Sequence, residues 1–130
     1  MIEKRAIIFD DNELFRFVIA RILKSKDFKV KSYPSPCLYF CIQSGVDTCP
    51  VTTACTDFLL TDQMMPDMTG LEFLRRTKRM QCKIPDSRKA IISVDWTEET
   101  FGEAKQFTSY VFNKFDAKEK ISLWIEHSHF

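Results

Sequence analysis

The sequence predicts a doubly wound α/β fold, in which a five-stranded parallel sheet lies between two layers of helices. Five short apolar runs alternate along the chain with five segments of helical character. Strands joined by helical crossovers pair in parallel, and both faces of such a sheet are covered. The 130 residues suit one domain with a sizeable core. We therefore expect a single domain over residues 1–130, with the strand order 2-1-3-4-5.

The first strand is predicted at residues 6–9, and the first helix starts near Asn12. Apolar residues of this helix recur at intervals of three and four, which is the spacing of one helix face. They are Phe15, Val18, Ile19, Ile22 and Leu23. A second strand is predicted at Phe28–Tyr33.

A second helix is predicted to open at Ser35 and Pro36, because serine favours the N-cap and proline the first helical turn. Gly45 is expected to end this helix, since glycine readily adopts the left-handed conformation that closes many helices. Residues 46–56 have no helical period and are predicted to form the longest loop.

The second half of the chain repeats the alternation three times. Its strands are predicted at residues 58–61, 89–94 and 109–113. A loop marked by Pro66 and Gly70 leads into a helix at residues 71–79.

Two further helices are predicted from their first turns. Asp95 and Glu98 have the spacing of a capping box, which favours a helix start at Asp95. Asp116 and Glu119 have the same spacing and are expected to start the fifth helix. The buried stripe of that helix is expected to contain Ile121, Trp124 and Ile125.

Charge and hydropathy argue against several classes of protein. Nineteen basic and eighteen acidic residues leave a net charge of +1, which gives no sign of direct nucleic-acid binding, although a local basic patch is compatible with it. No apolar run approaches the ~20 residues that span a bilayer, so no membrane insertion is expected. The N-terminus has no signal-peptide pattern, and we expect a cytoplasmic location. Because the chain ends after the fifth helix, no output domain is expected.

The five cysteines stand at positions 37, 41, 49, 55 and 82. An odd number without a secretion signal argues against a disulfide framework. Cys37 and Cys41 have the spacing of one helix face, and with Cys49 and Cys55 they would supply four thiolates to a metal. Because the sequence contains no Cys-x-x-Cys pair, reduced packing thiols are the preferred interpretation. The loop at residues 46–56 receives no functional assignment.

Five polar residues lie at or just past the ends of the predicted strands. They are Asp10, Asp11, Asp62, Ser93 and Lys114. Ligands of such sheets bind outside the carboxyl ends of the strands, so these side chains should meet at one edge. Three acids, one hydroxyl and one ammonium suit a divalent cation and a phosphoryl group.

Transfer of a phosphoryl group to a carboxylate requires that charge on the phosphoryl oxygens be neutralised. Mg²⁺ (or Mn²⁺) does this with oxygen ligands, usually one or two carboxylates, phosphate oxygens and waters. Asp10 and Asp11, after the first strand, suit that role. Asp62 lies across the switch point between strands 1 and 3, where an acceptor is needed. Lys114 and Ser93 can contact the remaining phosphoryl oxygens.

Four stretches resemble the receiver domain of two-component response regulators. They are IIFDDNE at residues 7–13, DQMMPDMTGLEFL at 62–74, IIS at 91–93 and NK at 113–114. The block that starts at Asp62 is the most specific of them. The resemblance covers nearly the whole chain and implies a flavodoxin-like three-layer sandwich.

The resemblance implies that Asp62 accepts a phosphoryl group from a phosphohistidine of a sensor histidine kinase or phosphotransfer protein. The implied Mg²⁺ ligands are Asp10, Asp11, Asp62 and the backbone carbonyl of Met64. Ser93 and Lys114 would contact the phosphoryl group. Phosphorylation would shift the equilibrium of the face formed by helix 4, strand 5 and helix 5, which binds a downstream target. Such a protein catalyses only its own phosphorylation and dephosphorylation.

Three positions depart from the family pattern. Val94 follows Ser93 where the family usually has alanine or glycine, and its extra methyl groups would narrow access to Asp62. Phe115 replaces a proline that follows a cis peptide bond. A cis bond costs about 3–4 kcal/mol without proline, which favours a differently built loop. Val111 replaces the aromatic switch residue, and the neighbouring Tyr110 would face the other side of the sheet.

Two alternatives remain. A haloacid-dehalogenase-like phosphatase also uses a strand-end aspartate and Mg²⁺, but it needs Asp-x-Asp after the first strand, and position 12 is asparagine. A receiver-like interaction scaffold would bind its partner without phosphorylation. The departures at Val94, Val111 and Phe115 keep this second alternative open.

Overall fold

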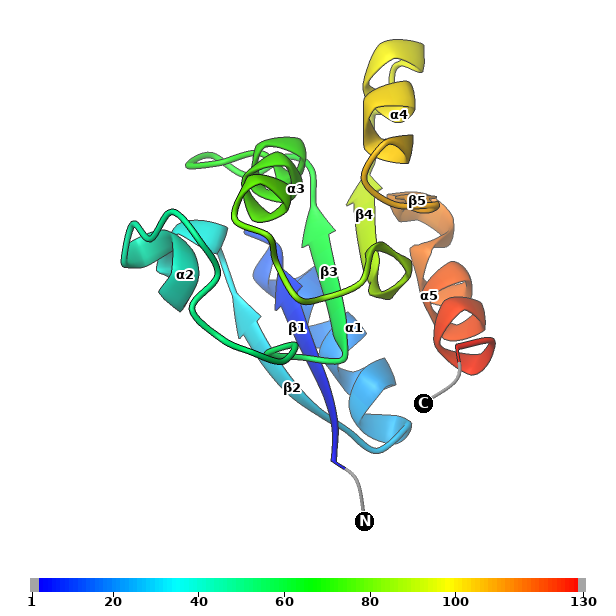
Figure 1. The fold of residues 1–130 in the computed structure, drawn as a ribbon. Coiled ribbons are helices and arrows are strands. Elements are labelled where there is room, and N and C mark those ends of the chain that lie inside the picture. Colours follow the sequence, from blue (N-terminus) through cyan, green and yellow to red (C-terminus); the bar gives the residue numbers. More distant parts are fainter. Residues whose placement is uncertain (1–2, 129–130) are drawn as a thin grey trace.

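In the computed structural model, which describes residues 3–128, five strands form one parallel sheet with the order β2-β1-β3-β4-β5 (Figure 1). The strands are β1 (Lys4–Phe9), β2 (Phe28–Tyr33), β3 (Phe58–Asp62), β4 (Lys89–Ser93) and β5 (Tyr110–Asn113). The predicted strand order is confirmed. The bounds of β2 match the prediction, and those of the other strands differ by one or two residues at an end.

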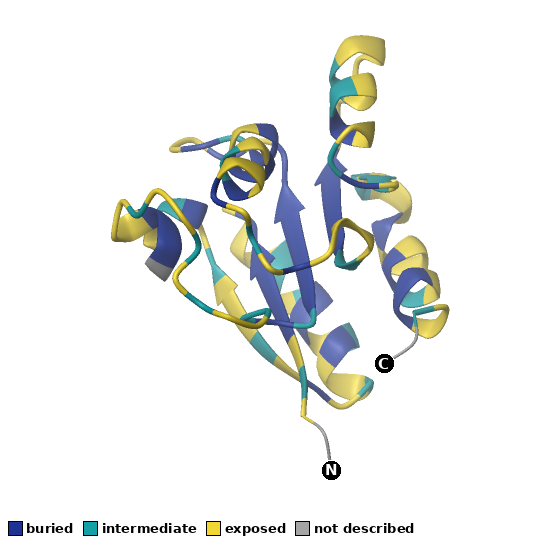
Figure 2. Ribbon diagram, in the orientation of Figure 1, coloured by how far each residue is buried: buried dark blue, intermediate teal, exposed yellow. Residues whose placement is uncertain are grey.

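The helices cover both faces of the sheet, as predicted. On one face lie α1 (Glu13–Ser25) and α5 (Ala117–Glu126), and on the other lie α2 (Phe40–Gln43), α3 (Gly70–Arg79) and α4 (Glu98–Lys105) (Figure 1). Figure 2 shows β3 and β4 buried between helices whose outer faces are exposed, whereas the edge strand β2 is largely exposed. Within residues 3–128, none of the helices combines the length and apolarity that crossing a membrane requires.

Each face of the sheet has its own apolar cluster. Ile19 and Leu23 of α1 and Ile121 of α5 pack on one face, and the expected stripe Ile121, Trp124 and Ile125 is buried. Phe73 of α3 packs on the other face, where its ring contacts that of Phe9 with centroids 4.9 Å apart. These contacts hold the strand ends rigidly, because buried aromatic rings in contact leave little room for displacement.

The second helix is shorter than predicted. Ser35 does accept a hydrogen bond, from the backbone N–H of Cys37, but the segment that follows is a 3₁₀ turn at Pro36–Leu38. The α-helix proper is only the four residues of α2. Cys37 and Cys41 therefore belong to different elements and do not share one helix face. Gly45 follows α2 with a φ of +68°, as a residue that closes a helix does.

The prediction for the start of the fourth helix was wrong. Thr97, and not Asp95, is the N-cap, and Thr97 and Thr100 form the capping box. The backbone N–H of Asp95 instead donates to the Ser93 hydroxyl, which keeps this segment in a loop. The fifth helix does begin after Asp116, but within the described residues the carboxylate of Asp116 makes no capping hydrogen bond.

Two glycines in helices provide a stability test with opposite signs. A Cβ at Gly70 would lie 2.5 Å from the carbonyl oxygen of Asp62 and 2.9 Å from the Ile91 side chain. Gly70→Ala should therefore lower the free energy of unfolding by about 1–3 kcal/mol. Urea unfolding followed by circular dichroism measures this change, and a Gly70→Ala protein as stable as wild type would contradict the packing described.

The matched control is Gly102→Ala in α4. A Cβ at this exposed position meets nothing within 4 Å. Because alanine loses less backbone entropy than glycine in a helix, this variant should gain about 0.5–1 kcal/mol.

Candidate functional site

Three carboxylates meet at the carboxyl edge of the sheet. Asp10 and Asp11 follow β1, and Asp62 is the last residue of β3. Because β1 and β3 are neighbours in register, one oxygen from each of the three carboxylates lies within 4.8 Å of the other two. Asp10 and Asp62 are buried, with 2% and 4% of their surface exposed, whereas Asp11 is exposed.

The backbone around Asp10 is fixed by three hydrogen bonds. Its N–H donates to the carbonyl of Tyr33 on β2 over 3.1 Å. Its carboxylate accepts from the N–H of Asn12 over 2.8 Å, and its carbonyl accepts from the Arg16 guanidinium over 2.7 Å. Asn12 also caps α1, so one short turn both starts the helix and aims the carboxylate.

Gln63 fixes the backbone that follows Asp62. Its N–H donates to the carbonyl of Ile92 on β4 over 2.7 Å, and its own carbonyl accepts from the N–H of Gly70 over 3.1 Å. Its side-chain oxygen accepts from the N–H of Leu71 over 2.8 Å. The sequence analysis missed this role. A polar residue directly after a buried strand, with a glycine seven positions later, was the available signal.

Lys114 brings one positive charge to the carboxylates. Its Nζ lies 3.1 Å from an oxygen of Asp10 and 3.6 Å from an oxygen of Asp62. The ammonium also lies 4.5 Å from the centroid of the Phe15 ring. The predicted meeting of Lys114 with the strand-end acids is therefore present in the structure.

Burial and mutual repulsion disfavour the charged forms of the two buried acids. Burial raises the pKa of Asp10 above its usual range, although Asn12 and Lys114 oppose this. Burial, and then the charge of Asp10, raises the pKa of Asp62 to about 7. One ammonium faces three carboxylates, so the cluster as it stands has an excess of negative charge. An all-oxygen donor set of this charge fits the preference of Mg²⁺.

Ser93 and Met64 are near the cluster in the chain but differ in exposure. Ser93 is fully buried at the end of β4, and its hydroxyl accepts from the N–H of Asp95 over 3.2 Å. Asp62 pairs with Ile92, the residue before Ser93, so the hydroxyl lies one position beyond Asp62 along the sheet. Met64 lies in the loop after β3 with an exposed side chain. The role of its carbonyl stays a prediction.

Residues 6–119 of this chain match the model of a protein family described as "Response regulator receiver domain". The chain belongs to this family. Phosphorylation and magnesium binding are typical of receiver domains, and the receiver fold and membership in two-component signalling expected from the sequence are confirmed.

Known proteins agree with this assignment. Probable histidine kinase 6 of Oryza sativa subsp. japonica is 32% identical over 93 residues, which are 70% of this receiver domain and 9% of the kinase. The structure of FixJ-N is 25% identical and superposes with a TM-score of 0.70, covering 100% of this chain and 99% of that one. Chemotaxis protein CheY4 of Vibrio cholerae, 17% identical, has the same fold with a TM-score of 0.70, covering 96% of this chain and 98% of that one.

Tyr110 and Val111 of β5 face opposite sides of the sheet, as expected for neighbouring residues of a strand. Tyr110 packs towards α5, where its ring lies 5.4 Å from that of Trp124, whereas Val111 packs on the opposite face of the sheet. Trp96, in the loop before α4, is a residue that the sequence analysis missed. Its indole N–H donates to the carbonyl of Phe112 on β5 over 2.8 Å. An aromatic side chain from this loop therefore ties β5 to the end of β4.

The loop after Lys114 is a short turn built from trans peptide bonds. Among residues 3–128 no peptide bond is cis, and Lys114–Asp116 form a 3₁₀ turn. The Asn113 side chain accepts from the N–H of Phe115 over 3.0 Å. This turn leaves Phe115 85% exposed.

The raised pKa of Asp62 gives a stability test in chelator. Because the folded pKa of about 7 exceeds the unfolded value of 3.8, the folded state keeps a proton that the unfolded chain has lost between these values. Stability therefore falls as pH rises through this window. Asp62→Asn removes the penalty and should be more stable than wild type at pH 8, by on the order of 1–4 kcal/mol.

Urea unfolding at pH 8 and at pH 4 measures this difference, which should shrink at the lower pH. Asp57→Asn is the control, because Asp57 is a half-buried residue just before the other end of β3. It should not stabilise, since its carboxylate accepts from the backbone N–H of Arg5 and forms an ion pair with the Arg5 side chain. An Asp62→Asn protein that is no more stable than wild type at pH 8 would show that burial and the charge of Asp10 do not disfavour the ionised form of Asp62 as described.

Proposed function

We propose that this receiver domain accepts a phosphoryl group on Asp62, in a Mg²⁺-dependent reaction, from the phosphohistidine of a sensor histidine kinase or phosphotransfer protein. The observation that carries the proposal is the ammonium of Lys114 in contact with two buried carboxylates of a three-carboxylate cluster. A buried acceptor, a counter-charge and an oxygen-rich cation site together are what such a transfer requires.

The proposed ligands of Mg²⁺ are Asp10, Asp11, Asp62 and the backbone carbonyl of Met64. When bound, the ion would neutralise charge on the transferring phosphoryl oxygens. The exposure of Asp11 supports this assignment, because it leaves the cation side of the cluster open to solvent. The hydrogen bond from Asn12 to Asp10 fixes one ligand before the ion arrives.

Three residues of the chain take part in the transfer itself. An oxygen of the Asp62 carboxylate forms the new bond to phosphorus, and the bond between phosphorus and the donor's imidazole nitrogen breaks. The ionised carboxylate needs no general base. Lys114 would exchange its contact with Asp62 for one with a phosphoryl oxygen, and the Ser93 hydroxyl would contact another, leaving the N–H of Asp95.

We place the surface that binds the downstream target on α4, β5 and α5. Two large apolar side chains on this surface are exposed to solvent. Phe101 of α4 is 39% exposed and Leu123 of α5 is 48% exposed. The bond from Trp96 to the carbonyl of Phe112 supports a link between this surface and Ser93, since Trp96 follows Ser93 by three residues.

We further propose that residues 1–130 act as one unit in the cytoplasm. They would bind proteins rather than nucleic acid or lipid, and turn over no separate substrate.

A second candidate function is a receiver-like scaffold that binds its partner without phosphorylation. The specific observation in its favour is Val94, which follows Ser93 and is 49% exposed at the edge where Asp62 lies. A branched side chain at this place would obstruct a phosphoryl donor. The absence of an aromatic side chain at Val111 would also weaken the coupling of the site to the surface.

The acceptor is tested by intact-protein mass after incubation with acetyl phosphate and Mg²⁺. Wild type should gain one phosphoryl group, which chelation of Mg²⁺ should prevent. Asp62→Asn should gain none, because it lacks the carboxylate oxygen that forms the bond. Asp57→Asn, just before the other end of β3, should behave as wild type. No gain in wild type that still binds Mg²⁺ would move the assignment to the scaffold.

Replacing Val94 by alanine tests the obstruction. Val94→Ala should be phosphorylated severalfold faster than wild type, because two methyl groups leave the path to Asp62. The rate is measured by mass at several times after adding acetyl phosphate. Leu38→Ala, another exposed apolar truncation but far from the carboxylates in the chain, should leave the rate unchanged. Equal rates for Val94→Ala and wild type would show that Val94 does not control access.

A further inference from the structure

Four of the five cysteines line one small cavity on the face of the sheet covered by α2 and α3. Cys41 comes from α2, Cys49 and Cys55 from the loop at residues 46–56, and Cys82 from the segment after α3. The cavity is bordered by Leu59, near the start of β3, so it lies away from the carboxylate edge. Its volume is about 20 Å³, which is room for roughly one water-sized sphere.

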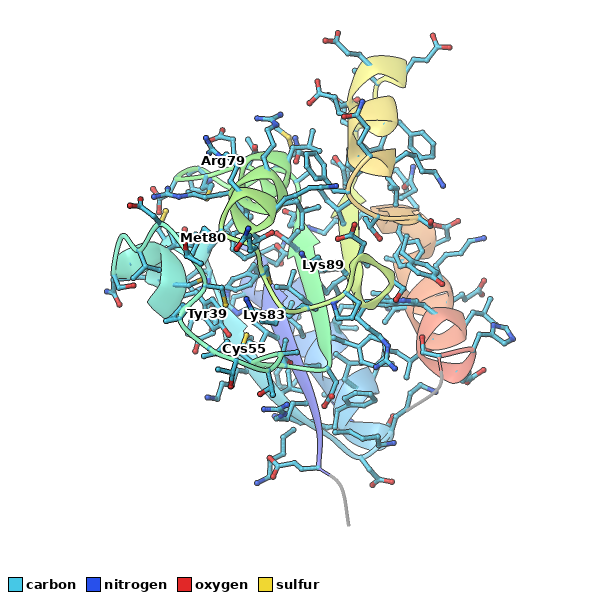
Figure 3. The ribbon with its side chains drawn as sticks, viewed as in Figure 1. Tyr39, Cys55, Arg79, Met80, Lys83 and Lys89 are labelled. Carbon is cyan, nitrogen blue, oxygen red and sulfur yellow. The ribbon has the colours of Figure 1, made fainter. Side chains whose placement is uncertain are left out.

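Backbone hydrogen bonds bring these separate segments to the end of α3. The N–H of Cys49 donates to the carbonyl of Met80 over 2.7 Å, and the N–H of Cys82 donates to the carbonyl of Thr77 over 3.0 Å. The Tyr39 hydroxyl donates to the sulfur of Cys55 over 2.9 Å. In Figure 3, Tyr39 and Cys55 lie between α2 and the sheet, below Met80.

We propose that this cavity binds one Zn²⁺ ion through Cys41, Cys49, Cys55 and Cys82. Four thiolates around an ion-sized space form the donor set of structural zinc sites, and soft sulfur ligands select zinc over magnesium or calcium. The site lies outside the phosphorylation machinery and does not depend on the proposed function. It gives a role to the loop at residues 46–56, which has no regular secondary structure.

The sulfurs must move closer together when the ion binds. Within residues 3–128, no three cysteine sulfurs lie within 4.8 Å of one another. Tetrahedral zinc with Zn–S bonds of about 2.3 Å needs sulfurs about 3.8 Å apart. Cys49 and Cys55 belong to an irregular, partly exposed segment, and we expect this segment to supply most of the movement. Binding of zinc would thus order the loop, as metal binding commonly does in small sites.

Burial raises the pKa of Cys41 to about 11 and also raises that of Cys55, so binding of the ion must offset the cost of ionising these thiols. Nearby basic groups would offset part of the charge that results, although Lys89 also pairs with Asp86. Four thiols release four protons to solvent as they bind Zn²⁺, which leaves a complex of net charge −2. Lys89 is buried, and its ammonium lies 3.5 Å from the hydroxyl of Thr77, which lines the cavity. Arg79 and Lys83 lie around the same end of α3 (Figure 3). The Tyr39 hydroxyl supplies the kind of hydrogen bond to a ligand that commonly supports metal sites.

The first test is metal content and cobalt spectroscopy on the full chain, purified in the presence of a non-thiol reductant. Wild type should contain about one zinc per chain, as four thiolates that meet at one cavity imply. Replacement by Co²⁺ should give a thiolate-to-cobalt charge-transfer band with intense d–d absorption typical of tetrahedral sites. Co²⁺ bound by the aspartate cluster has no thiolate band, which separates the two sites.

Cys55→Ser and Cys82→Ser should each lose the stoichiometric zinc and the four-thiolate spectrum. Cys37→Ser is the matched control, because Cys37 lies in the 3₁₀ turn and does not line the cavity. It should keep both. If wild type binds no zinc, or if the thiolate band persists unchanged in Cys55→Ser and Cys82→Ser, the proposal fails.

Alkylation of wild type gives a test that needs no variant. In native buffer, added Zn²⁺ should protect the four cavity cysteines from iodoacetamide and leave Cys37 as the modified residue, as peptide mapping would show. Equal modification with and without Zn²⁺ would overturn the proposal and leave the thiols as packing groups. A disulfide among the four in protein prepared without reductant, together with no zinc, would overturn it in favour of oxidation.

Discussion

Parallel, in-register pairing of β1 with β3 forces two carboxylates to lie side by side at a buried edge, and much of the site is arranged around that constraint. Asp10 and Asp62 cannot move apart without breaking the strand pairing that forms the centre of the sheet. Their repulsion is offset in part by Lys114, which arrives from the far strand β5. A strand order that placed β5 elsewhere would leave the two acids without this cation.

The elements around Asp10 and Asp62 hold the two carboxylates in place despite their repulsion. The rings of Phe9 and Phe73 pack together directly behind Asp10, and Gln63 bonds both to β4 and to the start of α3. Gly70 allows α3 to approach the Asp62 carbonyl closely, where any side chain would collide. The elements that hold the two aspartates bury much apolar surface, and this burial stabilises the fold by more than the repulsion between the carboxylates costs. The fold can therefore keep the two carboxylates side by side.

The sequence predicted the strands and the strand-end polar residues because apolar period and strand-end position are local signals. The strand order followed from the topology that doubly wound sheets share. The three aspartates and Lys114 meet as expected for that reason. The sequence misled where short-range signals compete: Asp95 and Glu98 match a capping box, but the hydroxyl of Ser93 holds Asp95 in the loop and leaves the cap to Thr97. The roles of Gln63 and Trp96 depend on contacts with distant strands, which no local pattern contains. The position of Cys82 beside the loop cysteines is equally non-local, because 26 residues lie between Cys55 and Cys82 in the sequence.

The two tryptophans of the chain stand in contrasting surroundings. Trp124 is buried, with its indole N–H bonded to the carbonyl of Ser87, whereas Trp96 is partly exposed and bonded to the backbone of β5. A rearrangement between β4 and α4 would change the solvent around one indole and leave the other as an internal reference. The molecule thus carries its own fluorescent probe, placed at the junction through which events at the carboxylates would reach the outer surface.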